Sequence, residues 1–278
     1  MEDHFKIAIL DMNAGVQNEG MRCIEMIVGK FLTQNGVKGN YDIFDVRTKN
    51  EVPAINDYDI FISSGGPGSP KIAGEDWEWP YFKFLDGVLT HNLINYNKKY
   101  VFLICHSYQL ACLHWDLAKV NKRRSTSFGI MPVHKTAEGE LDLLFEGLEN
   151  PFYAVDSRDY QVVSPKKRKL NSLGGKILCR EKIRPNIHLE RAVMAIRFSR
   201  EIVGVQFHPE ADSEGMMSYF QREDKKKQII KRYGKKKYLD MIEHLNDDDK
   251  ILMTHRMIIP RFLNEVSGKI QETRLVES

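Results

Sequence analysis

A cysteine stands at the point where an apolar segment gives way to a helical pattern. Tyr100-Val-Phe-Leu-Ile104 is a short apolar run that ends on Cys105, and helical spacing begins directly after it. A sharp turn from strand to helix exposes the residue at the turn and places a helix N-terminus beneath it. The helix dipole lowers the pKa of such a thiol, and the free N–H groups of the first turn can bind an oxyanion. Cys105 is therefore a candidate nucleophile, although this context alone fits an inert core cysteine equally well.

A second segment supplies groups that would activate the thiol. The apolar run that starts at Ile202 ends in Gln206-Phe-His-Pro-Glu210. A histidine at a strand end can act as a general base, and Glu210, two residues on, lies on the same side of an extended chain. Pro209 fixes the backbone between them, so Glu210 could hold the imidazole in one tautomer. Alone, the segment is also compatible with a strand end bearing a surface salt bridge. Together with Cys105, it predicts a Cys-His-Glu set.

A glycine-rich loop follows another apolar run. Ser63-Ser-Gly-Gly-Pro-Gly-Ser-Pro70 contains glycines that permit positive φ angles and a close approach of the backbone to a ligand. The loop lacks the Lys-Ser/Thr of a P-loop and the glycine spacing of a dinucleotide site. Its backbone N–H groups are therefore predicted to contact an oxyanion rather than a phosphate.

The elements that must position these residues alternate between apolar runs and helical stretches. This alternation predicts βα units, and hence an α/β fold with a mostly parallel sheet flanked by helices. The predicted helices cover residues 20–34 and 79–92, with a third directly after Cys105. The predicted strands cover residues 6–10, 41–46, 58–63, 100–104, 128–132, 152–155, 161–164, 176–179, 192–198 and 202–206.

The pattern changes after Asp212. Residues 213–278 carry many charges and apolar residues at helical spacing, with almost no strand signal. We predict two parts, a domain over residues 1–212 and a helical C-terminal extension over 213–278. Breaks in the extension are expected near Gly234, at Asn246–Asp249 and near Pro260. The lysine-rich segment Asp224–Lys227 is interpreted as a solvated helix face rather than a basic binding patch.

Composition limits the function classes. With 278 residues, 42% of them hydrophobic, the chain can bury a sizeable core. A net charge of only +3 argues against nucleic acid or a membrane surface as the main partner. No apolar run approaches the roughly 20 residues that span a bilayer, and the first residues do not resemble a signal peptide.

The cysteine pattern indicates a reducing compartment. Four cysteines are scattered without a C-x-x-C pair, so neither a disulfide framework nor a structural zinc site is expected, and we predict a cytoplasmic location. Cys112 and His114 could be imagined as metal ligands together with His106. Helical spacing instead turns Cys112 into the core, and no metal or other cofactor is predicted.

The three segments together resemble the class I (triad) glutamine amidotransferase family, and the glutaminase domain of guanylate (GMP) synthase within it. The family motifs G-G-P-G-x-P, G-x-C-x-G-x-Q and Q-F-H-P-E read here as Gly65-Gly-Pro-Gly-Ser-Pro70, Leu103-Ile-Cys-His-Ser-Tyr-Gln109 and Gln206-Phe-His-Pro-Glu210, in the same order. The resemblance covers about residues 5–220. It implies a flavodoxin-like sheet and a triad that attacks the side-chain amide of glutamine, forms a γ-glutamyl thioester and releases ammonia.

Matching the motifs by position implies roles for individual residues. Cys105 corresponds to the nucleophile, His208 to the base and then acid, and Glu210 to the group that orients His208. The backbone N–H groups of Gly66 and His106 correspond to the oxyanion hole. The resemblance implies that substrate is contacted by Gly65, Pro67, Gly68 and Gln109, and in a looser match by Ser157 and Asp159.

Two departures from the family pattern affect the expected substrate. Leu103 and Ser107 replace the glycines two before and two after the nucleophile, so a larger γ-glutamyl substrate is an alternative to glutamine. The chain lacks the S-G-G-x-D-S loop of an ATP-pyrophosphatase module. Either a separate synthase subunit receives any ammonia, or the protein acts alone as a hydrolase or transferase, and a homodimer is possible. A catalytically silent binding module and an acyltransferase with the same triad are the remaining alternatives.

Overall fold

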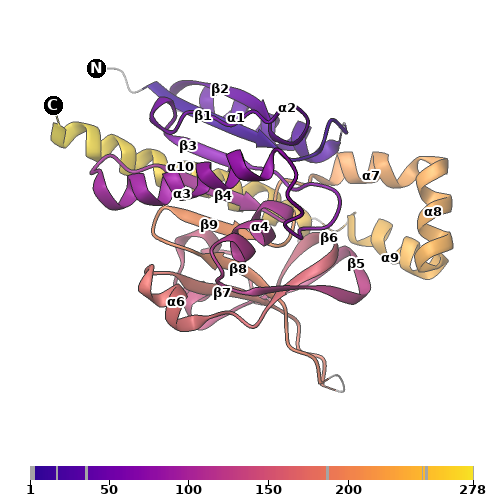
Figure 1. Cartoon of the computed structure of the whole chain (residues 1–278). Helices are drawn as coiled ribbons and strands as arrows, with labels where there is room; N and C mark the ends of the chain where they lie inside the picture. The colour runs from indigo at the N-terminus through magenta and orange to yellow at the C-terminus, as the bar shows by residue number, and fades with distance from the viewer. Residues whose placement is uncertain are drawn as a thin grey trace.

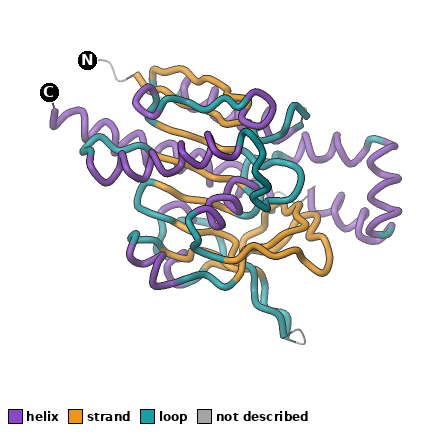
Figure 2. The backbone as a smooth tube through the Cα atoms, viewed as in Figure 1, coloured by secondary structure: helices purple, strands orange, loops and turns teal. Residues whose placement is uncertain are grey.

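A computed structural model describes residues 4–16, 18–34, 37–185, 188–245, 247 and 250–277. Over these residues the chain forms a nine-stranded sheet with the order β2-β1-β3-β4-β9-β8-β7-β5-β6, and helices cover both of its faces (Figures 1 and 2). The predicted α/β fold with a largely parallel sheet flanked by helices is confirmed. No helix in these ranges is long and apolar enough to cross a membrane.

The first part of the sheet consists of five parallel strands, which are β1 (His4–Asp11), β2 (Lys38–Asp45), β3 (Ile60–Ser63), β4 (Tyr100–Ile104) and β9 (Ile202–Val205). Ser63 of β3 pairs with Leu103 of β4, and Leu103 pairs with Gly204 of β9. Because these strands run parallel and in register, their carboxyl ends meet at one edge of the sheet. The segments that follow β3, β4 and β9 carry the residues that were predicted to take part in the chemistry.

The second part of the sheet is antiparallel and contains β5 (Lys119–Lys135), β6 (Phe152–Val163), β7 (Lys176–Glu181) and β8 (Val193–Arg197). The prediction of separate strands at 152–155 and 161–164 is wrong, because β6 is continuous. The reason is a charged pair in its middle: Arg158 and Asp156 are buried and bonded to each other at 2.9 Å. Charged residues that pair inside the protein break the apolar pattern by which a strand is recognised.

Helices pack on the two faces of the sheet according to the alternation of its side chains. Phe5 and Ile7 of β1 belong to the core formed with α1 (Glu19–Thr33) and α10 (Ile251–Glu277). Ala8 and Leu10 belong to the core formed with α3 (Glu78–Ile94) and α4 (His106–His114). The short helical segments are α2 (Val46–Lys49), η1 (Ile55–Asp57), α5 (Ala137–Glu140), η2 (Leu143–Phe145) and α6 (Lys167–Ser172).

The C-terminal region contains α7 (Ser213–Gln221), α8 (Glu223–Tyr233), α9 (Lys235–Leu245) and α10. A helix break at Gly234 is confirmed, with a φ of 88°. The break predicted at Asn246–Asp249 falls largely outside the described residues. The break predicted near Pro260 is wrong, since α10 continues through it. Its neighbours Ile259 and Phe262 are buried against the sheet, and this packing holds the helix together across a residue that cannot donate a backbone hydrogen bond.

The helices after residue 212 pack in two different places. In Figure 1, α7, α8 and α9 group beside β5 and β6, and they share an apolar cluster with Ile130 and Val155 of those strands. In contrast, α10 covers the same face of the sheet as α1. The division at residue 212 remains a prediction of domain organisation. In packing, the last helix belongs to the core of the sheet.

The contribution of α10 to stability can be measured at Phe262. Its ring is buried and packs edge-on against Phe102 of β4, with 5.1 Å between ring centroids. We expect Phe262→Ala to lower the free energy of unfolding by about 3–5 kcal/mol, because a large buried ring leaves a cavity. Denaturant unfolding would measure the change. Val276→Ala, at an exposed position of the same helix, should change stability by less than about 0.5 kcal/mol. Equal effects of the two substitutions would contradict the role of α10.

Candidate active site

Cys105 lies between β4 and α4 in a strained backbone conformation. Its φ is 47° and its ψ is −94°, which non-glycine residues seldom adopt. Its N–H donates to the carbonyl of Val205 at 2.8 Å, and its carbonyl accepts the first hydrogen bond of α4, from the N–H of Gln109 at 3.0 Å. The N–H groups of the three residues between Cys105 and Gln109 therefore precede the first hydrogen bond of the helix and point toward its N-terminal end. The predicted turn from strand to helix is present at this cysteine.

His208 and Glu210 follow β9 and are held together. The Nδ1 atom of His208 lies 2.8 Å from Oε1 of Glu210, a carboxylate that is only 3% exposed. The other oxygen, Oε2, has no hydrogen-bond partner among the described residues. The first turn of α1 lies close by, because a Cβ atom on Gly20 would come within 3.3 Å of Oε1. The positive end of that helix favours a negative charge on Glu210.

The electrostatics of the site favour a protonated His208. Burial by itself lowers the pKa of this imidazole, but the interactions of the ring with Glu210 and with the side chain of Cys105 raise the pKa well above its ordinary value. Cys105 therefore lies beside the ring that Glu210 orients. A carboxylate-oriented imidazole beside a cysteine can activate the thiol as a nucleophile.

The glycine-rich loop after β3 closes over these side chains. A Cβ atom on Gly65 would lie 2.9 Å from Cε1 of His208 and 3.6 Å from Cβ of Cys105. A Cβ atom on Gly66 would lie 2.3 Å from the carbonyl oxygen of Met12. Only glycine therefore fits at either position, and the backbone of the loop lies directly against the thiol and the imidazole. The guanidinium of Arg47 donates to the carbonyl of Pro67 at 2.7 Å and holds the loop in place.

His106 begins α4 and is buried. Burial and the nearby charge of Arg47 lower the pKa of its imidazole to about 4, so the ring is neutral at neutral pH. A neutral ring carries no positive charge that could stabilise an oxyanion. The group of His106 that could do so is its backbone N–H at the start of α4.

The two departures from the family pattern are accommodated by their surroundings. Leu103 pairs with Gly204, and Tyr108 packs over that glycine, since a Cβ atom there would come within 2.7 Å of the tyrosine ring. The hydroxyl of Ser107 donates to the carbonyl of Ser64 at 2.6 Å and lies 2.8 Å from the hydroxyl of Ser63. Ser107 thus ties α4 to the end of β3.

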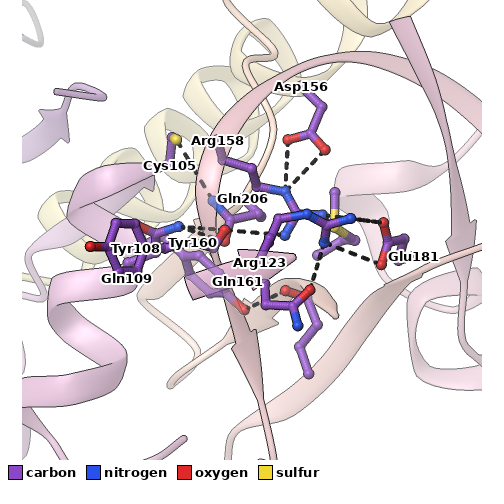
Figure 3. A network of polar contacts seen from close by, with 12 residues as sticks. Cys105, Tyr108, Gln109, Arg123, Asp156, Arg158, Tyr160, Gln161, Glu181 and Gln206 are labelled. Carbon is purple, nitrogen blue, oxygen red and sulfur yellow. Dashed lines mark hydrogen bonds and ion pairs between the residues drawn. The ribbon is translucent and has the colours of Figure 1, made fainter. Parts of the chain in front are cut away.

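Gln109 and Gln206 form a polar floor beneath the cysteine (Figure 3). The amide Nε2 of Gln109 donates to Oε1 of Gln206 at 3.0 Å and to the carbonyl of Tyr160 at 3.3 Å. Nε2 of Gln206 lies 3.6 Å from Sγ of Cys105. Sequence analysis did not predict a role for Gln206. Its signal in the sequence was limited to its place two residues before His208, because residues 206 and 207 form a bend after β9 whose direction the sequence does not give.

Ser157 and Asp159 lie on β6, which passes the candidate triad. The N–H of His208 donates to the carbonyl of Val155 at 2.8 Å, so this part of β6 lies directly beside His208. Ser157 and Asp159 are exposed on one face of this strand and line the same cavity as Cys105. The structure therefore brings the predicted substrate-binding residues Gly65, Pro67, Gly68, Gln109, Ser157 and Asp159 together around one cavity.

The opposite face of β6 is charged but buried (Figure 3). Arg158 binds Asp156 and also approaches Glu181, which pairs with Arg123 at 2.9 Å. Burial by itself raises the pKa of Glu181, but Arg123 and Arg158 hold that pKa below its usual value. Nη1 of the Arg158 guanidinium donates to the carbonyl of Tyr160 at 3.4 Å, the same carbonyl that Gln109 contacts. This network fixes the position of β6 beside Cys105.

The cavity has a volume of about 1000 Å³ and a wall that sequence analysis did not anticipate. Cys105, His208 and the loop after β3 form one side. Residues of α7 and α8, among them Tyr219, Ile229 and Arg232, form the opposite side. The extension was predicted only as a run of helices after residue 212, with the segment Asp224–Lys227 as a solvated helix face. The apolar face of a helix predicts that another element packs against it. It does not show whether the helix borders a binding site.

The other cysteines lie in different surroundings. Burial raises the pKa of Cys23 to about 12, and it raises the pKa of Cys112 and of Cys179. Cys112 is fully buried in the core beside Tyr108, while the ring of His114 stacks on Phe82 and bonds to Asp86. The interpretation of Cys112 as a core residue is confirmed.

The sequence of residues 24–227 matches the family described as glutamine amidotransferase class-I. The match covers most of the chain. The protein is a member of the class I glutamine amidotransferase family. Its family membership supports hydrolysis of the glutamine amide in general. No curated protein sequence matches the chain.

Solved structures of glutamine amidotransferases share the fold of this family member. A glutamine amidotransferase from Thermotoga maritima has a TM-score of 0.65 at 14% identity, over 95% of this chain and 98% of the other. A protein from Thermoplasma acidophilum, described as part of a GMP synthase, has a TM-score of 0.50 at 19% identity, over 74% and 85%. The glutaminase domain of Trypanosoma brucei CTPS with bound acivicin has a TM-score of 0.51 at 15% identity, over 76% and 88%.

The coupling between Glu210 and His208 predicts a pH-dependent stability. Because the pKa of His208 is raised by folding, its contribution is fully present below the unfolded value of about 6.5 and is lost as the pH rises through the folded pKa. Glu210→Gln removes the charge that supports the imidazolium. We expect it to lower the pKa of His208 and to cost about 1–3 kcal/mol near pH 6, with a smaller cost at higher pH.

NMR titration of the His208 imidazole and denaturant unfolding at several pH values would test this coupling. Glu214→Gln, in the exposed first turn of α7, is the matched control and should leave the His208 titration unchanged. A His208 titration that is the same in the wild type and in Glu210→Gln would show that the carboxylate does not govern the imidazole.

Proposed function

We propose that this protein hydrolyses the side-chain amide of glutamine, or of a γ-glutamyl amide, through Cys105, His208 and Glu210. The observation that carries the proposal is the strained turn at Cys105, which lies against the same glycine, Gly65, as the imidazole of His208, a ring held by a buried carboxylate. Family membership supports the same reaction class.

In the first half of the reaction, the thiolate of Cys105 attacks the amide carbon, and the carbonyl oxygen becomes an oxyanion. The N–H groups of Gly66 and His106 are proposed to stabilise this charge. His208 then donates its proton to the amide nitrogen, the carbon–nitrogen bond breaks, and ammonia leaves. The product on the enzyme is a γ-glutamyl thioester of Cys105.

In the second half, His208 accepts a proton from water as the water oxygen attacks the thioester carbon. The tetrahedral intermediate collapses, glutamate leaves, and the thiolate of Cys105 is restored beside a protonated His208. Glu210 keeps the imidazole oriented throughout and stays ionised. Gln206, 3.6 Å from Sγ, is proposed to keep the thiolate aligned with the imidazole.

The cavity is large enough for a γ-glutamyl substrate bigger than glutamine, and such a substrate is the second candidate. A volume of about 1000 Å³ is at the upper end of the range for small-molecule sites, so space remains beyond a γ-glutamyl group. Turnover of glutamine and of γ-glutamyl amides, compared by kcat/KM, distinguishes the two substrate classes.

The fate of ammonia and the cellular setting are further proposals. We propose that a separate synthase subunit receives the ammonia, which is consistent with the similar Thermoplasma acidophilum protein described as a GMP synthase subunit. Four free cysteines fit a cytoplasmic location. A homodimer remains a prediction.

Replacement of the nucleophile tests the central assignment. We expect Cys105→Ala to reduce glutamate release by a factor of about 10³ or more, because the covalent step is lost. A coupled glutamate assay would measure it, and Cys179→Ala, at a buried cysteine on β7, should retain activity. Equal turnover by wild type and Cys105→Ala would exclude this cysteine as the nucleophile. A wild type without activity on any amide would favour a silent binding module.

The glycine-rich loop can be tested at Gly66. A methyl group there would meet the carbonyl oxygen of Met12, so Gly66→Ala must displace the backbone that is proposed to bind the oxyanion. We expect kcat to fall by about 10²–10³ with a smaller change in KM. Steady-state kinetics would measure both, with circular dichroism to confirm folding. Gly29→Ala in α1, where a methyl group meets open space, should keep full activity. An unchanged kcat in Gly66→Ala would remove this loop from the oxyanion hole.

A further inference from the structure

Arg232 of α8 reaches across the cavity to β5 and β6. Its Nη2 donates to the hydroxyl of Thr126 at 2.8 Å and lies 3.6 Å from Oδ1 of Asp159. The hydroxyl of Thr126 in turn donates to the same Oδ1. An arginine and an aspartate are thus held side by side in the wall of the cavity that contains Cys105.

The position of this pair relative to Cys105 is fixed by the network beneath the site. Asp159 precedes Tyr160, whose carbonyl accepts a hydrogen bond from Gln109, one turn of α4 beyond the cysteine. Arg232 is held by its neighbour Tyr233, which stacks on Phe128 at 5.0 Å between centroids, while the guanidinium lies 5.3 Å from the Tyr233 ring. Two aromatic rings therefore fix the end of α8 against the mouth of the cavity.

The pair is accessible to a ligand. The side chains of Arg232 and Asp159 are 60% and 50% exposed, and an ion pair with that exposure adds little to stability. Its two charges can therefore exchange their mutual contact for contacts with a ligand at small cost. A guanidinium binds a carboxylate through parallel N–H donors, and a carboxylate accepts hydrogen bonds from an ammonium. Adjacent charges of opposite sign are complementary to the ammonium and carboxylate of an α-amino acid.

We propose that Arg232 binds the α-carboxylate of the γ-glutamyl group while Asp159 binds its α-ammonium, so that α8 completes the substrate site. This inference rests on the proposed function, which places the γ-amide of the same molecule at Cys105. It gives the helical extension a role in substrate selection: amides without the zwitterionic end lose the contact with α8.

Binding to the full chain with the Cys105→Ala substitution tests this directly, because the substrate is not consumed. Glutamine and 4-aminobutanamide, which is glutamine without its α-carboxylate, would be compared by calorimetry. We expect Arg232→Ala to weaken glutamine about tenfold or more and to leave 4-aminobutanamide unchanged. Arg232→Lys should restore part of the loss. Lys231→Ala, an exposed cation next to Arg232 and outside the cavity, should change neither ligand.

The complementary substitution addresses the ammonium. Asp159→Asn should weaken glutamine and 4-aminobutanamide, and leave 4-carbamoylbutanoate, which lacks the α-ammonium, unchanged. Equal losses for both amides in Arg232→Ala, the same loss in Lys231→Ala, or no binding of glutamine would overturn the inference. Glutamine turnover by the otherwise wild-type protein separates the two proposals. If Cys105→Ala abolishes turnover and Arg232→Ala leaves KM unchanged, the proposed function stands and this inference fails.

Discussion

The parallel register of β3, β4 and β9 is the constraint on which the site depends. Ser63, Leu103 and Gly204 are consecutive partners across these strands, so the three chain segments that follow them leave the sheet at the same edge. The glycine-rich loop, the Cys105 turn and the His208 segment come from distant parts of the sequence. Backbone hydrogen bonds between the strands place these three segments next to one another, and this placement does not depend on their side chains.

The packing around this edge explains how a tight backbone turn persists. The positive φ of Cys105 is costly, and it is held by hydrogen bonds from its own N–H to β9 and from α4 to its carbonyl. Ser107 adds bonds to Ser63 and Ser64, which couple α4 to β3 as well. Cys105 is thus fixed by both neighbouring strands, which is the rigidity that a positioned thiol would require.

The strand β6 carries charge on both faces, with opposite consequences. Asp156 and Arg158 face the interior, where burial forces them to pair with each other and with the Glu181–Arg123 pair. Ser157 and Asp159 instead face the cavity. The alternation of a single strand therefore separates a structural ion network from a candidate binding surface. The helices α7 and α8 then enclose that surface, while α10 stabilises the sheet from behind.

The local sequence determined the parallel α/β core and the groups of the candidate triad. Apolar runs, helical spacing and the residues at strand ends are short-range signals, and they indicated Cys105, His208, Glu210 and the loop at Gly65 correctly as neighbours. Those signals failed where long-range contacts decide the outcome. The strand β6 continues through Asp156 and Arg158 because these charged residues find buried partners. The helix α10 continues through Pro260 because it packs against the sheet. Tertiary structure alone placed Gln206 beneath the thiol and Arg232 beside Asp159, because the distances between such residues depend on how whole elements pack and not on their spacing along the chain.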